Sequence, residues 1–275
     1  MAISTFWRYS NYNAPVNYLF DKQIVEMDIS KANINILMDK KAISYDDYAD
    51  LMNADRMIRQ YTIGCLIRDK PETQEILNQG LMDAREALFN ILNLENSNVL
   101  HIAKDAVFVV VPLSQNVPEE IPITGFIKFT KRSSHTSYLR LNRLIHFYYS
   151  YDMINGTDSW KIRGMNQTAQ EQHQSGFTQI LSSILRNKQV AGTKAAYDQC
   201  KFYYEQLASG KPMMVPYARR FDSQSLFDLK IDSGFAPFQA EYLSETMEPF
   251  VDPSYNLSLL KDIGNYLLCE AMSGL

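Results

Sequence analysis

Cysteine is scarce in this chain of 275 residues, which contains only Cys65, Cys200 and Cys269. The three cysteines lie far apart in the sequence and are odd in number. They therefore provide neither a disulfide framework nor the clustered ligands of a zinc site. A chain without paired cysteines is typical of a reducing compartment, and we expect a cytoplasmic protein.

Long apolar runs are also missing. No stretch approaches the roughly 20 consecutive apolar residues that a membrane-spanning helix needs. Residues 1–15, "MAISTFWRYSNYNAP", lack the basic and then apolar layout of a signal peptide. The sequence therefore predicts a soluble protein with no membrane partner.

Several common catalytic motifs are absent. The sequence has no glycine-rich phosphate loop, no G-x-S-x-G elbow and no H-E-x-x-H pair. Its four histidines are scattered, and no cysteine has a partner that would indicate a nucleophile. These absences exclude the P-loop nucleotide hydrolases, the elbow-type serine hydrolases and the helical zinc proteases.

The overall charge is slightly acidic, with a formal net charge of -4 and a pI of about 5.6. A polyanionic partner would therefore have to meet a local basic patch. Between Lys128 and Arg163 the chain carries seven basic residues against two acidic ones. This stretch is either a surface that follows a phosphate backbone or a solvated strand face balanced by acids elsewhere.

The pattern of apolar residues predicts an α+β fold. Residues 23–29, "QIVEMDI", alternate as a strand. Helical segments follow over 31–41, 42–51 and 54–68, the second with Ser44 and Asp47 spaced as a capping box, and Pro71 opens a longer helix. Strands are expected in 98–112, with a turn at Lys104 and Asp105, then over 123–130, 136–152 and 159–165.

The region after residue 166 is expected to be helical. The last helix, within 256–275, repeats apolar residues at helical spacing at Leu257, Leu260, Ile263 and Leu267. Such a stripe either packs in the core or docks on a protein partner, and core packing is the commoner use. The only subdivision that the sequence suggests lies near residue 166.

Two acidic residues are notable because of their neighbours. Asp28 ends an apolar strand just before a helix, and Asp105 lies at the expected hairpin turn. If the two strands are neighbours, the carboxylates converge, and Mg²⁺ prefers such oxygen ligands. The simpler interpretation is that Asp28 caps a helix and that Asp105 is an ordinary turn residue.

The order of these segments resembles the palm of template-dependent DNA polymerases. "DISKANIN" (28–35) is similar to the first palm motif, and its Asp-x-Ser form is that of family A. "RMIRQYTIG" (56–64) resembles the fingers motif, and "VLHIAKDAVFVV" (99–110) resembles the family B hairpin Tyr-Gly-Asp-Thr-Asp-Ser-Val-Phe-Val. The stretch 137–165 is similar to the family B segment that ends in a Lys-Gly pair. Together they resemble a minimal, divergent palm of the phage type.

The chain departs from the polymerase pattern at named positions. Ala103 stands where the hairpin motif has its first Asp, and Ala106 where it has Ser. Asn33 and Asn35 replace the Glu and Arg of the family A first motif. The loss of the hairpin acid favours an alternative, in which the protein is an inactive descendant of a palm that serves as a nucleic-acid-binding or assembly subunit of a phage complex.

The resemblance implies a template-directed nucleotidyltransferase that uses two divalent ions (Mg²⁺ or Mn²⁺) held by Asp28 and Asp105, DNA as primer and template, and nucleoside triphosphates. It implies a palm-like domain over 1–166 with a fingers-like insert at about 31–95, and a thumb-like or partner-docking region over 167–275. It places the protein in the cytoplasm of a bacterial host. The implied metal ligands are Asp28, Asp105 and the Ile29 carbonyl; the implied nucleotide-binding residues are Ser30, Arg56 and Arg59; the implied nucleic-acid contacts are Lys131, Arg132, Arg140, Lys161 and Arg163.

Overall fold

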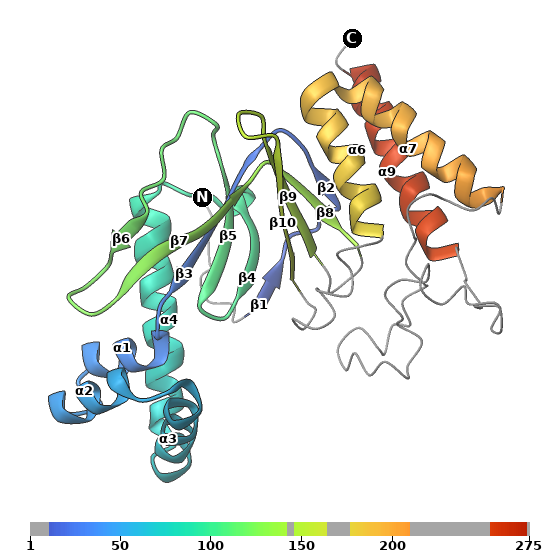
Figure 1. The fold of residues 1–275 in the computed structure, drawn as a ribbon. Helices are drawn as coiled ribbons and strands as arrows, with labels where there is room; N and C mark the ends of the chain where they lie inside the picture. The colour runs from blue at the N-terminus through green and yellow to red at the C-terminus, as the bar shows by residue number, and fades with distance from the viewer. Residues whose placement is uncertain (1–10, 142–145, 164–176, 210–253, 274–275) are drawn as a thin grey trace, which may run out of the picture. The chain divides into compact units, whose positions relative to one another are not determined.

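The structure is a computed structural model that describes residues 11–141, 146–163, 177–209 and 254–273. It contains two antiparallel sheets together with helices, so the predicted α+β class is confirmed (Figure 1). The chain forms two compact units. Unit 1 comprises Met1–Val16 and Lys22–Ser134, and unit 2 comprises Asn17–Asp21 and His135–Leu275. The boundary expected near residue 166 lies outside the described residues.

The sheet of unit 1 places β3 between β5 and β7, in the order β1-β4-β5-β3-β7-β6. β4 and β5 form the predicted hairpin, and β3 is antiparallel to β5, with Asp28 opposite Ala106. β3 therefore ends beside the hairpin turn. The strands are β1 (Asn11–Asn13), β3 (Gln23–Ile29), β4 (Val99–Ala103), β5 (Ala106–Val111), β6 (Glu120–Pro122) and β7 (Lys128–His135).

Helices fill the connection from β3 to β4. The predicted capping box is confirmed, because the Ser44 hydroxyl accepts from the Asp47 amide at 3.1 Å and the Asp47 carboxylate accepts from the Ser44 amide. Asp55 caps the next helix by accepting from the Ile58 amide at 2.9 Å. The helices are α1 (Ala32–Asp39), α2 (Tyr45–Asn53), α3 (Arg56–Asp69) and α4 (Glu72–Ile91), followed by the short 3₁₀ helix η2 (Asn96–Asn98).

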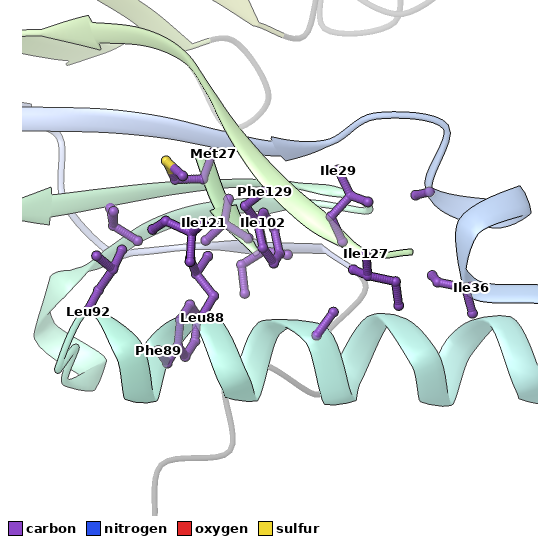
Figure 2. Close-up of a cluster of buried hydrophobic side chains, with 14 of the residues drawn as sticks. Met27, Ile29, Ile36, Leu88, Phe89, Leu92, Ile102, Ile121, Ile127 and Phe129 are labelled. Carbon is purple, nitrogen blue, oxygen red and sulfur yellow. The ribbon is translucent and has the colours of Figure 1, made fainter. Parts of the chain in front are cut away.

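The core of unit 1 follows from the alternation in β3. Val25, Met27 and Ile29 point to one face of the sheet, where α4 packs with Leu88 and Phe89 (Figure 2). Each such buried side chain contributes about 1.5–3 kcal/mol of hydrophobic free energy. The other face of β3 carries Glu26 and Asp28, so the strand presents its acids away from α4.

The strand expected over 123–130 was wrong in its first half. β7 begins only at Lys128, because the Thr124 hydroxyl accepts hydrogen bonds from the amides of Phe126 and Ile127 at 3.2 and 3.0 Å. The Ile123 amide also bonds back to the Ile127 carbonyl at 2.8 Å. The stretch therefore forms the tight connection between β6 and β7.

Unit 2 joins an antiparallel sheet, in the order β10-β9-β8-β2, to a helical layer. Phe147, Tyr149 and Ile162 on one face of the sheet share a core with Ile180 and Ile184 of the first helix. The elements are β2 (Tyr18–Leu19), β8 (Ser137–Arg140), β9 (His146–Asp152), β10 (Thr157–Arg163), α6 (Phe177–Ala191), α7 (Thr193–Ala208) and α9 (Ser254–Ser273).

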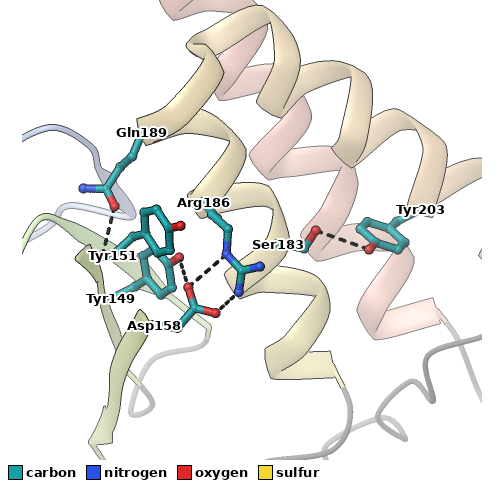
Figure 3. A network of polar contacts seen from close by, with 7 residues as sticks. All are labelled: Tyr149, Tyr151, Asp158, Ser183, Arg186, Gln189 and Tyr203. Carbon is teal, nitrogen blue, oxygen red and sulfur yellow. Dashed lines mark hydrogen bonds and ion pairs between the residues drawn. The ribbon is translucent and has the colours of Figure 1, made fainter. Parts of the chain in front are cut away.

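A polar network ties α6 to the β9–β10 hairpin (Figure 3). Asp158 accepts from the Tyr149 hydroxyl at 2.5 Å and from Arg186 Nε at 3.1 Å. The Arg186 guanidinium also lies 5.5 Å from the ring centroid of Tyr151, whose backbone amide donates to Gln189 Oε1 at 3.0 Å. These groups satisfy one another within unit 2, so the network fixes the angle of α6 on the sheet.

The apolar stripe of the C-terminal helix is occupied within unit 2. Leu260, Ile263 and Leu267 of α9 are buried in the same core as Cys200 of α7, and the Cys200 thiol donates to the Leu260 carbonyl at 3.1 Å. Of the two uses that the sequence left open for this stripe, core packing is the one observed.

Candidate functional site

The two acidic residues singled out in the sequence lie at the same edge of the unit 1 sheet. Asp28 is the penultimate residue of β3, and Asp105 lies in the turn between β4 and β5. The amide of Ile29 donates to the Asp105 carbonyl at 3.3 Å. The strand that presents one carboxylate is therefore hydrogen-bonded to the turn that presents the other.

The carboxyl group of Asp28 lies in an environment that disfavours its charge. Burial raises the pKa of Asp28, and the nearby negative charge of Asp105 raises it further. Arg132 on β7 opposes both effects, because its Nε donates to Asp28 Oδ2 at 3.1 Å. The net shift is upward, so burial and the neighbouring acids together outweigh the effect of Arg132.

Glu26 adds to this negative charge from deeper in the sheet. It is on the same face of β3 as Asp28, and it is buried, with its carboxylate accepting from the Ser133 hydroxyl at 2.7 Å. Its charge is among the causes that raise the pKa of Asp28. Glu26 does not line the cavity described next, so we treat it as a supporting group.

A cavity of about 820 Å³ opens beside the two acids within unit 1. Its volume falls in the range of about 300–1,000 Å³ that is usual for small-molecule sites. Three basic residues that were not predicted as site residues from the sequence also line the cavity: Lys31, Arg85 and Lys104. The residues selected from the sequence that line it are Asp28, Ile29, Ser30, Arg56, Arg59, Asp105 and Arg132.

Two of the four arginines that line the cavity come from the first turn of α3. Arg56 and Arg59 are three residues apart, so they share a helix face. Arg59 Nη1 donates to the Ala54 carbonyl at 2.8 Å, which fixes its side chain near the start of the helix. Ile63 and Ile67 continue the same wall one and two turns later. The wall is thus cationic near one end of α3 and apolar further along.

Arg85 is the functional candidate that the sequence reading missed. It lies on α4, is only 2% exposed, and its guanidinium donates to the backbone carbonyl of Lys104 in the hairpin turn. Burial lowers the pKa of Arg85 to about 10, and the charge of Asp105 acts in the opposite direction. The sequence does hold a signal, because Arg85 interrupts the apolar stripe between Leu81 and Phe89.

Two neighbouring basic residues predicted to act together are separated by the pleat of β7. Lys131 and Arg132 point to opposite faces of the sheet. Arg132 is at the cavity, whereas Lys131 forms an ion pair with Glu119 and donates to the Val117 carbonyl at 3.3 Å. Only Arg132 is therefore near the acids.

The remaining predicted basic residues belong to unit 2, where they share one face of the sheet. Arg140 of β8 and Arg163 of β10 both lie opposite His146 of β9, so the three residues form one row across the sheet. Lys161 lies opposite Tyr148 in the next row on that face. These three basic residues therefore lie in neighbouring rows on one face of the unit 2 sheet.

The described ranges contain no group of three or more His, Cys, Asp and Glu side chains that could hold a metal ion. A metal site at the end of β3 would therefore have two carboxylates to rest on, those of Asp28 and Asp105. Carboxylate and carbonyl oxygens are the donors that Mg²⁺ and Mn²⁺ prefer, and Mg²⁺ is commonly held by one or two carboxylates while substrate phosphates supply further ligands.

Within the described ranges, no helix is long and apolar enough to cross a membrane.

Comparison with known proteins places the chain in a phage family. No curated protein matches the sequence. A family model described as "Bacteriophage PBS1 gene 130 protein" matches residues 1–233, which is most of the chain. The chain belongs to the Bacteriophage PBS1 gene 130 protein family.

Proposed function

We propose that the protein is a template-directed nucleotidyltransferase, similar to a DNA polymerase, whose reaction centre is the cavity of unit 1. The observation that carries the proposal is the meeting of Asp28 and Asp105 at a cavity that is also lined by Arg56 and Arg59. Paired carboxylates opposite arginines suit a reaction in which divalent cations and a triphosphate meet.

The donor groups fit Mg²⁺ or Mn²⁺. Asp28 and Asp105 supply hard oxygen ligands, and the carbonyl of Ile29 is a further candidate beside them. The raised pKa of Asp28 comes first from burial and then from the negative charge of Asp105, and a bound cation would offset both effects. When bound there, the metal would activate the attacking hydroxyl and stabilise the leaving pyrophosphate.

The chain's own residues would bind and orient the nucleotide. Arg56 and Arg59 provide planar guanidinium groups, which match phosphate oxygens in pairs. The hydroxyl of Ser30, between the acids and the start of α1, is available for a phosphate or sugar oxygen. Ile63 and Ile67 form an apolar wall that would exclude water from the reacting groups.

The strand order explains how the two acids come together. β3, the helices α1–α4 and the hairpin β4–β5 form a split β-α-β arrangement, in which β5 lies between the two strands that the helices connect. This arrangement brings the end of β3 to the hairpin turn, as the resemblance to a polymerase palm implies. Fold alone does not imply function, so the argument rests on the site.

Nucleic acid is the proposed partner of the basic residues outside the cavity. Arg140, Lys161 and Arg163 share one sheet face of unit 2, and contacts of this kind position a phosphate backbone without reading its sequence. Lys131 and, at the cavity itself, Arg132 have the same proposed role, for which Arg132 would have to leave Asp28 or act from beside it. For a phage protein of this activity, the site of action would be the cytoplasm of the bacterial host.

An inactive palm-derived subunit is the second candidate. The observation that favours it is the row Asp28–Ala106–Ala103 across three strands, in which two alanines stand beside the one acid. Arg132 also pairs with Asp28 and supplies a positive charge within the protein itself. Such a protein would bind DNA with a salt-dependent affinity and without dependence on Mg²⁺.

Primer extension on a primed DNA template, with Mg²⁺ or Mn²⁺, tests the proposal. Asp28→Ala and Asp105→Ala should each abolish incorporation, and Asp69→Ala, at the exposed end of α3, is the matched control. Incorporation that persists in both site variants would reject this centre. DNA binding without incorporation in the wild-type protein would instead support the inactive subunit.

A further inference from the structure

Both backbone carbonyls of the β4–β5 turn accept hydrogen bonds from other elements of unit 1. The Asp105 carbonyl accepts from the Ile29 amide at 3.3 Å, and Ile29 directly follows Asp28. The Lys104 carbonyl accepts from the guanidinium of Arg85 on α4. The turn is therefore hydrogen-bonded both to the neighbouring strand β3 and to the helix α4.

The turn needs such support because its backbone is strained. Lys104 has a φ of 54°, in the left-handed region. For a residue with a Cβ this conformation is unfavourable, because the Cβ comes too close to the following carbonyl oxygen. Two-residue hairpin turns with positive φ at their first central residue favour glycine there. A lysine in that place indicates that contacts outside the turn fix its conformation.

Burying the charged side chain of Arg85 costs free energy unless contacts with the turn offset that cost. Arg85 lies on the apolar stripe of α4, between Leu81 and Phe89, and is 2% exposed. An apolar side chain of similar length would fill this space without burying a charge. The Lys104 carbonyl and the nearby charge of Asp105 are the contacts that offset this cost.

We propose that Arg85 is a positioning residue that fixes the Lys104–Asp105 turn and thereby holds the Asp105 carboxylate beside Asp28. The role in catalysis rests on the proposed function, whereas the role in fixing the turn does not. Arg85 acts through the backbone of its neighbour and is not assigned contact with substrate. The experiment therefore measures the turn and the metal separately.

The first measurement is backbone amide hydrogen exchange in the metal-free protein. Arg85→Gln should speed exchange of the Ile29 amide at least about 10-fold, because the carbonyl that it bonds belongs to the loosened turn. Arg85→Lys should keep part of the protection. Arg68→Gln, an exposed arginine on α3, is the control and should leave the Ile29 amide unchanged. Unchanged protection in a folded Arg85→Gln protein would overturn the inference.

The second measurement is Mn²⁺ binding followed by electron paramagnetic resonance. Loss of a residue that orients a metal ligand typically weakens affinity about 10- to 100-fold, and we expect this of Arg85→Gln. Adding Lys104→Gly, which relieves the strained φ, should restore more of the affinity than adding Lys104→Ala, which removes the same charge and keeps the strain. If Arg85→Gln does not fold, Arg85→Lys with and without Lys104→Gly carries the same comparison. Failure of Lys104→Gly to restore more affinity than Lys104→Ala would contradict positioning through the turn.

The two measurements separate the inference from the proposed function. If the wild-type protein binds no Mn²⁺ while Arg85→Gln still loosens the Ile29 amide, the metal centre is rejected and the positioning role of Arg85 stands. If Mn²⁺ binds at Asp28 but exchange and affinity are unchanged in Arg85→Gln, the inference about Arg85 is rejected and the metal centre stands.

Discussion

Arg132 Nε lies 3.1 Å from Asp28 Oδ2, so one oxygen of the proposed metal ligand is already engaged by a cation of the same protein. The two side chains come from adjacent strands, β7 and β3, and are 42% and 24% exposed. An ion pair with this exposure contributes at most about 1 kcal/mol to stability. Its larger effect is on the charge that a metal ion would meet.

Replacing Arg132 should therefore tighten metal binding. Removing a unit positive charge from about 4 Å of a divalent ion is worth roughly 2 kcal/mol in a well-solvated setting, which corresponds to about a 30-fold gain in Mn²⁺ affinity for Arg132→Gln. Calorimetric titration with Mn²⁺ measures this gain. Lys128→Gln is the control. Lys128 lies on the same strand as Arg132 but forms its exposed ion pair with Glu120 of β6, so its replacement should leave the Mn²⁺ affinity unchanged. Weaker binding in Arg132→Gln would place the metal elsewhere.

Asp28 makes stability depend on pH in a direction opposite to that of an ordinary ion-paired acid. Its pKa is raised in the folded state, so the folded protein releases this proton at higher pH than the unfolded chain does. The contribution of Asp28 to stability therefore falls as pH rises from its ordinary pKa of 3.8 through the raised value. In metal-free buffer, Asp28→Asn should be more stable than wild type at pH 7, and the gain should vanish near pH 3.8 and below.

Urea unfolding between pH 3.5 and 8 with a chelator measures this difference, and Asp83 supplies a control of opposite sign. Burial opposes ionisation of Asp83, but hydrogen bonds from Lys40 and Gln79 outweigh it and lower its pKa. Asp83→Asn should therefore be less stable at pH 7, with the loss disappearing as pH falls through the lowered pKa. An Asp28→Asn protein that is destabilised at pH 7 would contradict the upward shift of the Asp28 pKa.

Local sequence patterns predicted much of unit 1. β3 runs over the seven residues that alternate, because its acids and apolar residues point to opposite faces. The Ser44–Asp47 capping box and the Lys104–Asp105 turn are local as well, and both were found. The approach of Asp28 to Asp105 also requires β3 and β5 to be neighbours. The sequence does not establish this pairing, so the convergence of the two carboxylates was predicted only on that condition.

Features that depend on long-range packing were not predictable in the same way. The strands β1 and β2 are only three and two residues long, and they exist because they pair with β4 and β8. Arg85 was missed because a helical pattern does not reveal which backbone carbonyl lies above it. Lys131 and Arg132 were grouped by sequence proximity, although adjacent residues of a strand point to opposite faces.

Two helical glycines should respond in opposite ways to alanine. A Cβ at Gly64 of α3 would meet no atom within 4 Å, so Gly64→Ala should stabilise the protein by about 0.5–1 kcal/mol. A Cβ at Gly80 of α4 would collide with the Ile36 side chain, so Gly80→Ala should destabilise by about 1–3 kcal/mol. Chemical denaturation gives both values. Equal effects at the two sites would contradict the packing of α1 on α4.

Ala103 allows the two proposed functions to be distinguished by adding a group. Ala103 lies opposite Ala106, which lies opposite Asp28, and adjacent strands are about 4.8 Å apart. A carboxylate at Ala103 would therefore join the same face of the sheet about 10 Å from Asp28 at the backbone. Like charges at such separations repel by about 0.5–2 kcal/mol, so metal-free Ala103→Asp should be less stable at pH 7.

The same repulsion should favour a cation, and we expect Ala103→Asp to bind Mn²⁺ about 10-fold more tightly than wild type, a change of about 1.4 kcal/mol. Ala103→Asn is the control, because it has nearly the same shape without the charge and should bind as wild type does. Thermal unfolding with and without Mn²⁺ measures both effects. Equal Mn²⁺ affinity in the Asp and Asn variants would show that the metal does not lie on this row. Nucleotide incorporation that appears only in Ala103→Asp would identify the natural protein as the inactive form, because a single restored carboxylate would then complete the centre.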